Sequence, residues 1–257
     1  MSVVISIINQ KGGVGKTTTA INLGAFLAKK GKSVLLVDFD PQGNASSGVG
    51  IELKNRETSI YEVLIGKNLF KDIVQPTFFS NFHIAPSNQS LMGAAIELID
   101  LEYRESRLKK ALLEIKENYD YIIIDCPPSF CLLTINALMA TDKILIPVQA
   151  EYYALEGLGQ LLNSIDLIQK KMKSELKILG AVVTMYDKRN KLSEAVLQEL
   201  QQYFPYKIFQ SIIPRSVKLA EAPSFGQTIL QFDPISKGSE AYEKLAEEIL
   251  EYLESEK

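Results

Sequence analysis

The amino-acid sequence predicts an α/β fold in three layers, with a mainly parallel central sheet flanked by helices. Short runs rich in Val, Ile and Leu have the composition of strands buried on both faces; they occupy residues 3–8, 33–37, 121–124, 143–148 and 176–183. Between them, apolar residues recur every three or four positions, as on one face of a helix, at residues 16–30, 102–117, 132–140, 155–171, 192–203 and 236–253. Strands and helices that alternate in this way form βαβ units, whose strands are parallel.

The stretch from residue 44 to residue 90 mixes Gly, Pro and Asn with short elements, so its boundaries are not predicted in detail. Residues 82–85 within it have a strand-like pattern and include His83, the only histidine of the chain. We interpret His83 as a structural or surface residue because its neighbours alternate in polarity. A single histidine excludes most metal sites and catalytic triads that depend on this residue type.

Length and composition are those of one globular protein. The chain has 257 residues, of which 46% are hydrophobic and 23% charged, and no linker divides it, so we expect one domain over residues 1–257. No apolar run reaches about 18 residues, and we expect neither a membrane span nor a signal peptide. Cys126 and Cys131 are the only cysteines, which favours a reducing, cytoplasmic compartment, and we interpret both as buried small hydrophobes. The net charge of -3 argues against a globally basic nucleic-acid binder but allows a local basic surface.

The most specific signal is a glycine-rich loop, Lys-Gly-Gly-Val-Gly-Lys-Thr-Thr, at residues 11–18. It directly follows a predicted strand and opens a predicted helix, which is the context of a phosphate-binding P-loop. Its glycines let consecutive backbone amide groups surround an anion, and the helix adds its positive N-terminal dipole. In this geometry Lys16 reaches the β- and γ-phosphates and the Thr17 hydroxyl joins the Mg²⁺ shell. The expected nucleotide contacts of the loop are Lys11, Gly12, Gly13, Val14, Gly15, Lys16, Thr17 and Thr18.

Acidic residues stand at the ends of two predicted strands. Asp38 and Asp40 are two positions apart, so both side chains face the same way if the second strand continues that far. Asp125 follows the apolar run 121–124, which is the physical form of a Walker B motif and predicts a carboxylate that holds Mg²⁺ through water. For Asp38 and Asp40, solvated acids in a strand-end turn remain the alternative.

Lys11 connects the loop to a known family. Gln10 stands where the common P-loop pattern has its first glycine, and a lysine directly after it resembles the signature lysine of the deviant Walker A ATPases. That family includes ParA/Soj partition proteins, MinD, nitrogenase iron protein and arsenite-pump ATPases. The resemblance implies a P-loop NTPase fold, ATP and Mg²⁺ as cofactors, and an ATP-sandwich homodimer in which Lys11 reaches the nucleotide of the partner subunit. It also implies that Asp40 orients the attacking water, that Asp38 supports the Mg²⁺ region, and that Lys11, Lys16 and Asp40 are the catalytic residues.

Two further segments resemble the ParA/Soj branch of the family. One is residues 134–138, Thr-Ile-Asn-Ala-Leu; the other is residues 212–215, Ile-Ile-Pro-Arg, followed by Glu-Ala-Pro-Ser at residues 221–224. The resemblance places Pro214 and Ser216 in the adenine pocket, where relatives often carry Asn at the position of Ser216. Because the phosphate loop comes so early in the sequence, we expect no N-terminal helix-turn-helix domain.

A locally basic segment predicts a surface for DNA. Residues 186–218 contain six Lys or Arg and three Asp or Glu, a net charge of +3, which by itself is more often a solvated face. The family resemblance implies non-specific binding of double-stranded DNA by the ATP dimer, which doubles the basic surface. It also implies a ParB-like partner that stimulates hydrolysis, and a location in the cytoplasm at the nucleoid. The candidate DNA-binding residues are Lys188, Arg189, Lys191, Arg215 and Lys218.

Two alternative functions remain open. A MinD-like ATPase that cycles on membranes would need a basic amphipathic C-terminal helix. Residues 238–257 instead carry seven Glu and two Lys, a net charge of -5, which an anionic bilayer repels, so we expect no stable membrane association. A P-loop ligase or kinase that uses ATP to activate a small substrate is the second alternative.

Overall fold

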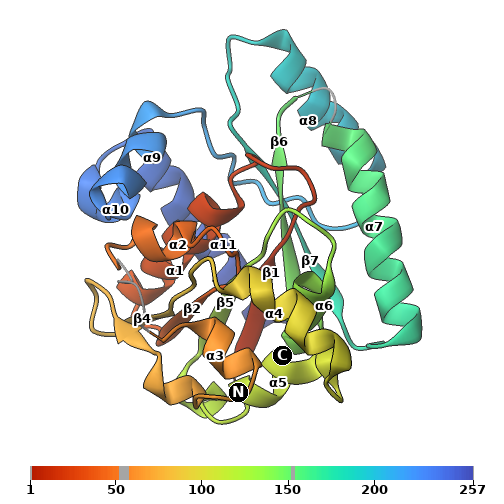
Figure 1. Ribbon diagram of the computed structural model, residues 1–257. Coiled ribbons are helices and arrows are strands. Elements are labelled where there is room, and N and C mark those ends of the chain that lie inside the picture. Colours follow the sequence, from red (N-terminus) through yellow and green to blue (C-terminus); the bar gives the residue numbers. More distant parts are fainter. Residues whose placement is uncertain (1, 52–57, 152–153, 257) are drawn as a thin grey trace.

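The computed structural model describes residues 2–51, 58–151 and 154–256, and in these ranges the chain forms a sheet of seven strands in the order β3-β4-β2-β5-β1-β6-β7 (Figure 1). The strands are β1 (Val3–Ile7), β2 (Val34–Asp38), β3 (Gln75–Pro76), β4 (Phe82–Ala85), β5 (Tyr121–Asp125), β6 (Lys143–Gln149) and β7 (Lys177–Thr184). Within the described ranges, every neighbouring pair is parallel except β3–β4, which is antiparallel. The predicted mainly parallel sheet is confirmed, and so is the strand at residues 82–85.

Helices cover both faces of this sheet (Figure 1). The α-helices are α1 (Lys16–Lys29), α2 (Asn44–Gly48), α3 (Ile60–Leu64), α4 (Leu91–Glu97), α5 (Arg107–Leu112), α6 (Leu132–Ala140), α7 (Ala154–Lys171), α8 (Lys191–Tyr203), α9 (Val217–Glu221), α10 (Ile229–Phe232) and α11 (Lys237–Ser255). Of the helices predicted from periodicity, all but one correspond to a single continuous helix with ends shifted by a few residues.

The alternation of side chains along each strand divides the core into two apolar clusters, one on each face. On β1, Ile5 and Ile7 pack with residues of α1, α2, α9, α10 and α11, whereas Val4 belongs to the cluster formed with α3 to α8. The side chains of Val4, Ile5 and Ile7 are each at most 1% exposed. Burial on both faces explains why the strands lack the apolar–polar alternation of a half-exposed sheet.

The predicted helix at residues 102–117 is wrong as a continuous element. The structure has a 3-10 turn at Arg104–Ser106, the short helix α5, and a second 3-10 turn at Lys116–Asn118. Tyr103 adopts a left-handed conformation with φ of 57°, which a helix interior does not tolerate. After Leu112 the hydrogen bonds tighten to the i+3 pattern, which places Ile115 above Leu112 so that both side chains are buried.

The stretch from residue 44 to residue 90 contains α2, α3, β3, β4 and a 3-10 turn at Phe70–Asp72, and its residues 52–57 lie outside the described ranges. The ring of His83 on β4 packs edge-on against Tyr119, with 5.7 Å between ring centroids. In the described part of the chain, no helix is both long enough and apolar enough to cross a bilayer.

Candidate nucleotide-binding site

The glycine-rich loop connects the carboxyl end of β1 to the first turn of α1. Gly13 and Gly15 have φ of 73° and 88°, a backbone conformation that residues with a Cβ rarely adopt. A Cβ on Gly12 or Gly13 would meet no atom within 4 Å, so this part of the loop borders open space. Helix α1 has neither a side-chain cap nor an acidic residue in its first turn. Its first amide groups are therefore directed at this space with nothing to neutralise them, which fits a bound phosphate.

Residues from other strands hold the loop in place. The Thr184 hydroxyl at the end of β7 donates to the Val14 carbonyl at 2.8 Å. The Asn9 side chain donates to the Pro147 carbonyl of β6 at 2.8 Å and accepts from the Lys11 amide at 3.0 Å. Sequence reasoning did not find Asn9 or Thr184 as site residues, because neither belongs to the P-loop pattern.

Lys16 lies in the interior of the site. It is 7% exposed, and its ammonium donates to the Lys11 carbonyl at 3.0 Å. Burial lowers the pKa of Lys16, and the negative charges of Asp125 and Asp40 oppose this shift. A desolvated cation held in this way is ready to bind phosphate oxygens with little reorganisation.

The sheet brings the predicted carboxylates together at the same edge as the loop. Asp38 and Asp125 are paired in register between β2 and β5, and Asp125 is also paired with Ile7 of β1. Asp40 follows two residues after Asp38; it is 8% exposed, and one carboxylate oxygen accepts from the Gln42 amide at 3.0 Å.

Asp38 and Asp125 differ in how their oxygens are used. Asp38 accepts hydrogen bonds from the amide and hydroxyl of Ser46 at 2.7 and 2.6 Å and from the Asp40 amide at 3.3 Å. Burial raises its pKa to about 6. Both oxygens of Asp125 are buried without a hydrogen-bond partner among the described residues. Burial, followed by the charge of Asp38, raises the pKa of Asp125 well above its usual range, while the Thr17 hydroxyl and Lys16 oppose the shift.

This donor set fits a hydrated Mg²⁺ ion. An unpartnered buried carboxylate needs a positive charge or donors to balance it, and the Thr17 hydroxyl acts on the same group. Among the described residues, no cluster of three or more His, Cys, Asp or Glu side chains could hold a metal by itself. Mg²⁺ needs no such cage, since it keeps several waters and binds one or two protein groups together with the phosphates of a nucleotide.

The two cysteines lie close to these elements but differ in exposure. Cys126 directly follows Asp125 and is buried, as expected. Cys131 is only half-buried, so the prediction that it is a buried hydrophobe is wrong. It stands just before α6; burial alone would raise its pKa, but hydrogen bonds from the Ser129 hydroxyl and from nearby amide groups outweigh burial and lower it.

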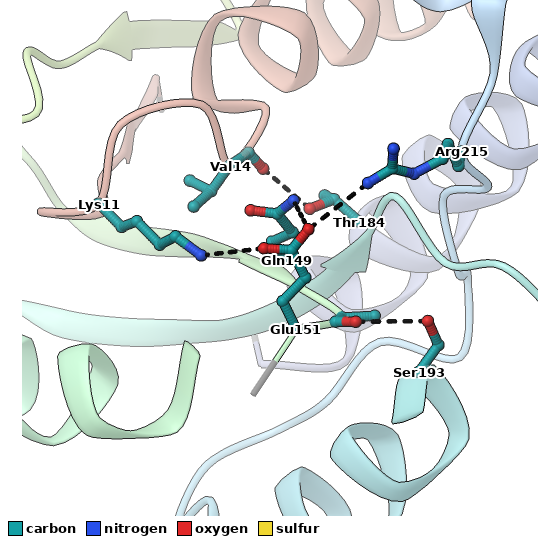
Figure 2. A network of polar contacts seen from close by, with 8 residues as sticks. Lys11, Val14, Gln149, Glu151, Thr184, Ser193 and Arg215 are labelled. Carbon is teal, nitrogen blue, oxygen red and sulfur yellow. Dashed lines mark hydrogen bonds and ion pairs between the residues drawn. The ribbon is translucent and has the colours of Figure 1, made fainter. Parts of the chain in front are cut away.

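Next to the loop, the side chains of Lys11, Gln149 and Arg215 meet at Glu151 (Figure 2). Glu151 follows β6, and one of its carboxylate oxygens lies 3.3 Å from the Lys11 ammonium. The other oxygen accepts from the Gln149 amide at 2.7 Å and lies 3.5 Å from the Arg215 guanidinium. Sequence reasoning had no signal for Glu151, which stands 140 residues from Lys11.

The candidate adenine and DNA-binding segments are brought together by a backbone bridge. Tyr186 pairs with Pro214, and the Arg215 amide donates to the Tyr186 carbonyl at 2.9 Å. The Ser216 hydroxyl accepts from the Leu219 amide at 3.5 Å and thereby caps α9. The five basic candidates on these segments are all exposed: Lys188, Arg189, Lys191, Arg215 and Lys218.

The two arginines of this basic surface have acidic partners. Arg189 forms two hydrogen bonds with Asp187, at 3.0 and 2.8 Å, and these bonds lower the pKa of Asp187 to about 2. Arg215 lies beside Glu151. Both pairs are open to solvent, so each is weak and can be exchanged for phosphate contacts.

Comparison with known proteins decides the family. A family model described as an AAA domain matches residues 2–178. The sporulation initiation inhibitor protein Soj of Bacillus subtilis is 53% identical over 249 residues, which cover 97% of this chain and 98% of Soj. The chain belongs to the Soj/ParA family of partitioning ATPases.

Solved structures of relatives have the same fold. A Mycobacterium smegmatis structure with bound ADP and magnesium, described as cobyrinic acid a,c-diamide synthase, has a TM-score of 0.88 and 35% identity, covering 100% of this chain and 97% of that one. The cell division ATPase MinD of Pyrococcus furiosus has a TM-score of 0.81 and 27% identity, covering 98% and 99%. This chain of the Soj/ParA family therefore has the three-layer P-loop ATPase fold predicted from its sequence.

Proposed function

We propose that this chain is an Mg²⁺-dependent ATPase that acts as a DNA-partitioning switch. In this proposal, two ATP-bound subunits form a sandwich dimer that binds double-stranded DNA without sequence preference, and a ParB-like partner stimulates hydrolysis and releases the dimer. The observation that carries the proposal is the Asp125 carboxylate, which has no hydrogen-bond partner among the described residues and lies near Lys16 and Thr17 at a glycine loop that borders open space.

The residues divide the work of ATP hydrolysis according to their positions. The loop amides and Lys16 bind the phosphates, and Lys16 neutralises charge that develops on the γ-phosphate. Thr17 and Asp125 hold Mg²⁺, which when bound stabilises charge on the β- and γ-phosphate oxygens. Asp38 supports this region from the adjacent strand. Asp40 orients the attacking water; among the described residues its carboxylate accepts one hydrogen bond, from the Gln42 amide, and retains capacity to accept from water.

Lys11 completes the site of the partner subunit. Its ammonium is directed toward Glu151 at the surface (Figure 2). Lys16 is instead buried, and its ammonium donates to the Lys11 carbonyl. A trans cation in this role resembles an arginine finger, which accelerates hydrolysis by about 10³- to 10⁵-fold in P-loop enzymes. Pro214 and Ser216 belong to a segment joined to Lys11 through Arg215 and Glu151, which is compatible with an adenine pocket beside the loop.

DNA binding is assigned to the exposed basic surface formed by the segments around Tyr186 and Pro214. Such a surface contacts the phosphate backbone and gives salt-dependent affinity without base readout. A dimer presents it twice, so binding depends on ATP. This assignment places the protein in the cytoplasm at the nucleoid.

The packing of α11 supports DNA rather than a membrane as the surface that the switch binds. Its apolar side chains, including Tyr242, Leu245 and Ile249, are buried against the sheet and α1. Acidic side chains on its outer side pair with lysines of α1, for example Glu243 with Lys29 at 2.7 Å. A helix that uses its apolar face in the core has none left for a bilayer.

One measurement tests the proposal directly. Binding to duplex DNA is measured at low and moderate salt with ATP, ADP or no nucleotide, for the wild type and for Lys16→Ala. Binding only with ATP, lost in the variant and weakened steeply by salt, is the expected result. Equal binding with all three nucleotide states would contradict the switch, and liposome co-sedimentation with ATP then tests the MinD-like alternative.

A small-molecule ligase is the second candidate, favoured by the synthase description of the Mycobacterium smegmatis structure. It predicts that ATP consumption depends on a small carboxylic acid and yields an amidated or phosphorylated product. Product analysis by mass spectrometry separates the two candidates, because the partitioning ATPase consumes ATP in the absence of any such substrate.

A further inference from the structure

Glu151 forms ion pairs with two cations beside the phosphate loop, Lys11 and Arg215. Lys11 and Arg215 approach different oxygens of the same carboxylate, and Gln149 donates to the oxygen shared with Arg215 (Figure 2). The side chains of Lys11 and Glu151 are 36% and 45% exposed, so the pair stands at the surface and not in the core.

The side chain of Lys11 is not needed as a cation inside its own phosphate loop. Lys16 supplies the internal cation, and its ammonium donates to the Lys11 carbonyl, which ties the Lys11 backbone to the loop. The Lys11 side chain then extends outward to Glu151. The two lysines therefore lie in different places. Lys16 is buried, where it can bind the phosphates of its own subunit, and Lys11 lies at the surface.

We propose that Glu151 is a positioning residue that holds Lys11 within its own subunit until the nucleotide of a second copy of this chain takes its place. The proposal rests on the sandwich dimer of the proposed function. The triphosphate of the partner carries several negative charges and outcompetes a single carboxylate for the ammonium. Without that nucleotide, Lys11 stays with Glu151 and the monomer is favoured.

The surroundings of Glu151 make the release reversible. When Lys11 leaves, the carboxylate keeps the Gln149 amide and the Arg215 guanidinium, so it is not left unpaired. An exposed ion pair is weak, but each dimer must break two of them, since the symmetric interface uses both copies of Lys11. Removal of the Glu151 charge is therefore expected to tighten ATP-dependent dimerisation by about 2- to 30-fold.

The test compares Glu151→Gln with a matched control, Glu243→Gln. Glu243 pairs with Lys29 at 2.7 Å on the α1–α11 side, so the control also removes one negative charge and one lysine partner. Both changes are made in an Asp40→Ala background to slow hydrolysis, and the dimer dissociation constant is measured by sedimentation with ATP and with ADP. Glu151→Gln should lower the constant with ATP within the stated range, and Glu243→Gln should leave it unchanged.

A second measurement tests the Lys11–Glu151 ion pair in the monomer. In nucleotide-free monomer, an amine-acylating reagent and peptide mass spectrometry report the reactivity of Lys11. Glu151→Gln should raise the labelling of Lys11 severalfold and leave that of Lys29 unchanged, with the reverse for Glu243→Gln. Unchanged labelling of Lys11, or an ATP dimer that Glu151→Gln weakens or leaves unaltered, would overturn the proposal. Failure of the parent protein to dimerise with ATP would instead overturn the sandwich dimer.

Discussion

Asp38 and Asp125 lie opposite each other in register on adjacent parallel strands, β2 and β5, and both are fully buried. The first carboxylate is satisfied by Ser46 and the Asp40 amide, and the second has no hydrogen-bond partner among the described residues. Burial raises the pKa of both carboxyl groups, and the negative charge of Asp38 raises that of Asp125 further. This arrangement is costly for the protein alone and becomes favourable when a cation binds between the strands and the nucleotide.

Asp125→Asn is expected to abolish Mg²⁺-dependent hydrolysis and at the same time stabilise the nucleotide-free protein. The amide keeps the shape of the carboxyl group but removes an unpaired buried charge, a change worth about 1 kcal/mol. For a chain of this size that corresponds to a rise of about 2–4 °C in Tm. Thermal unfolding in EDTA measures this rise in Tm. In a second experiment, addition of ATP and Mg²⁺ should raise the Tm of the wild type much more than that of the variant. A fall in Tm with EDTA would contradict the unpaired state of Asp125.

The pKa of Asp38 predicts a pH dependence of stability in the absence of nucleotide and Mg²⁺. Its pKa is about 6 in the folded protein because of burial, against about 3.9 in the unfolded chain. The folded state binds the proton more tightly, so the contribution of Asp38 to stability is present below about pH 4 and lost as pH rises through about 6. The free energy of unfolding should fall over this range by on the order of 3 kcal/mol.

Urea unfolding in EDTA at a series of pH values measures this slope. Asp38→Asn should reduce the slope, because the amide does not titrate. An increase in stability between about pH 4 and 7 would contradict the raised pKa values.

Asp40→Ala is expected to slow hydrolysis by about 10²- to 10⁴-fold while ATP-bound dimers still form. Among the described residues, the hydrogen bond that Asp40 accepts comes from the Gln42 amide of its own loop, and the charge of Asp125 remains beside Lys16 when Asp40 is removed. Phosphate release measures turnover, and light scattering measures the dimer. Normal turnover in this variant would show that Asp40 does not orient the attacking water.

Asp187→Asn should tighten DNA binding severalfold, because it frees Arg189 from two hydrogen bonds within its own loop. The salt dependence should steepen by about one phosphate contact per subunit. Arg189→Glu should have the opposite effect and leave ATPase activity intact. Titration of duplex DNA by fluorescence anisotropy at several salt concentrations provides both quantities.

The control for this prediction is Asp166→Asn, which removes the same charge from a pair with Lys170 on α7. If Asp166→Asn tightens DNA binding as much as Asp187→Asn, the effect comes from net charge alone and the local role of Arg189 is wrong.

The errors of sequence reasoning have common physical causes. Residues 102–117 keep a helical period in their apolar positions, yet the left-handed Tyr103 and the i+3 turns after Leu112 break the helix, since packing of Leu112 and Ile115 overrides local propensity. The exposure of Cys131 depends on the path of the loop after β5, and the amino-acid composition does not specify that path.

The sequence by itself determined the elements whose signals are local. The glycine loop, the strand that precedes it, the helix that opens at Lys16, and the buried strands that end in Asp38 and Asp125 all follow from residues adjacent in the chain. Their carboxyl ends meet because parallel strands share one edge. Only the tertiary structure decided which further side chains complete the site: Ser46, eight residues after Asp38, and, from segments far apart in the chain, Thr184 on the loop and Glu151 between Lys11 and Arg215. Such pairings leave no periodic pattern, because they depend on the order of strands in the sheet and on loop paths that bring residues more than a hundred positions apart into contact.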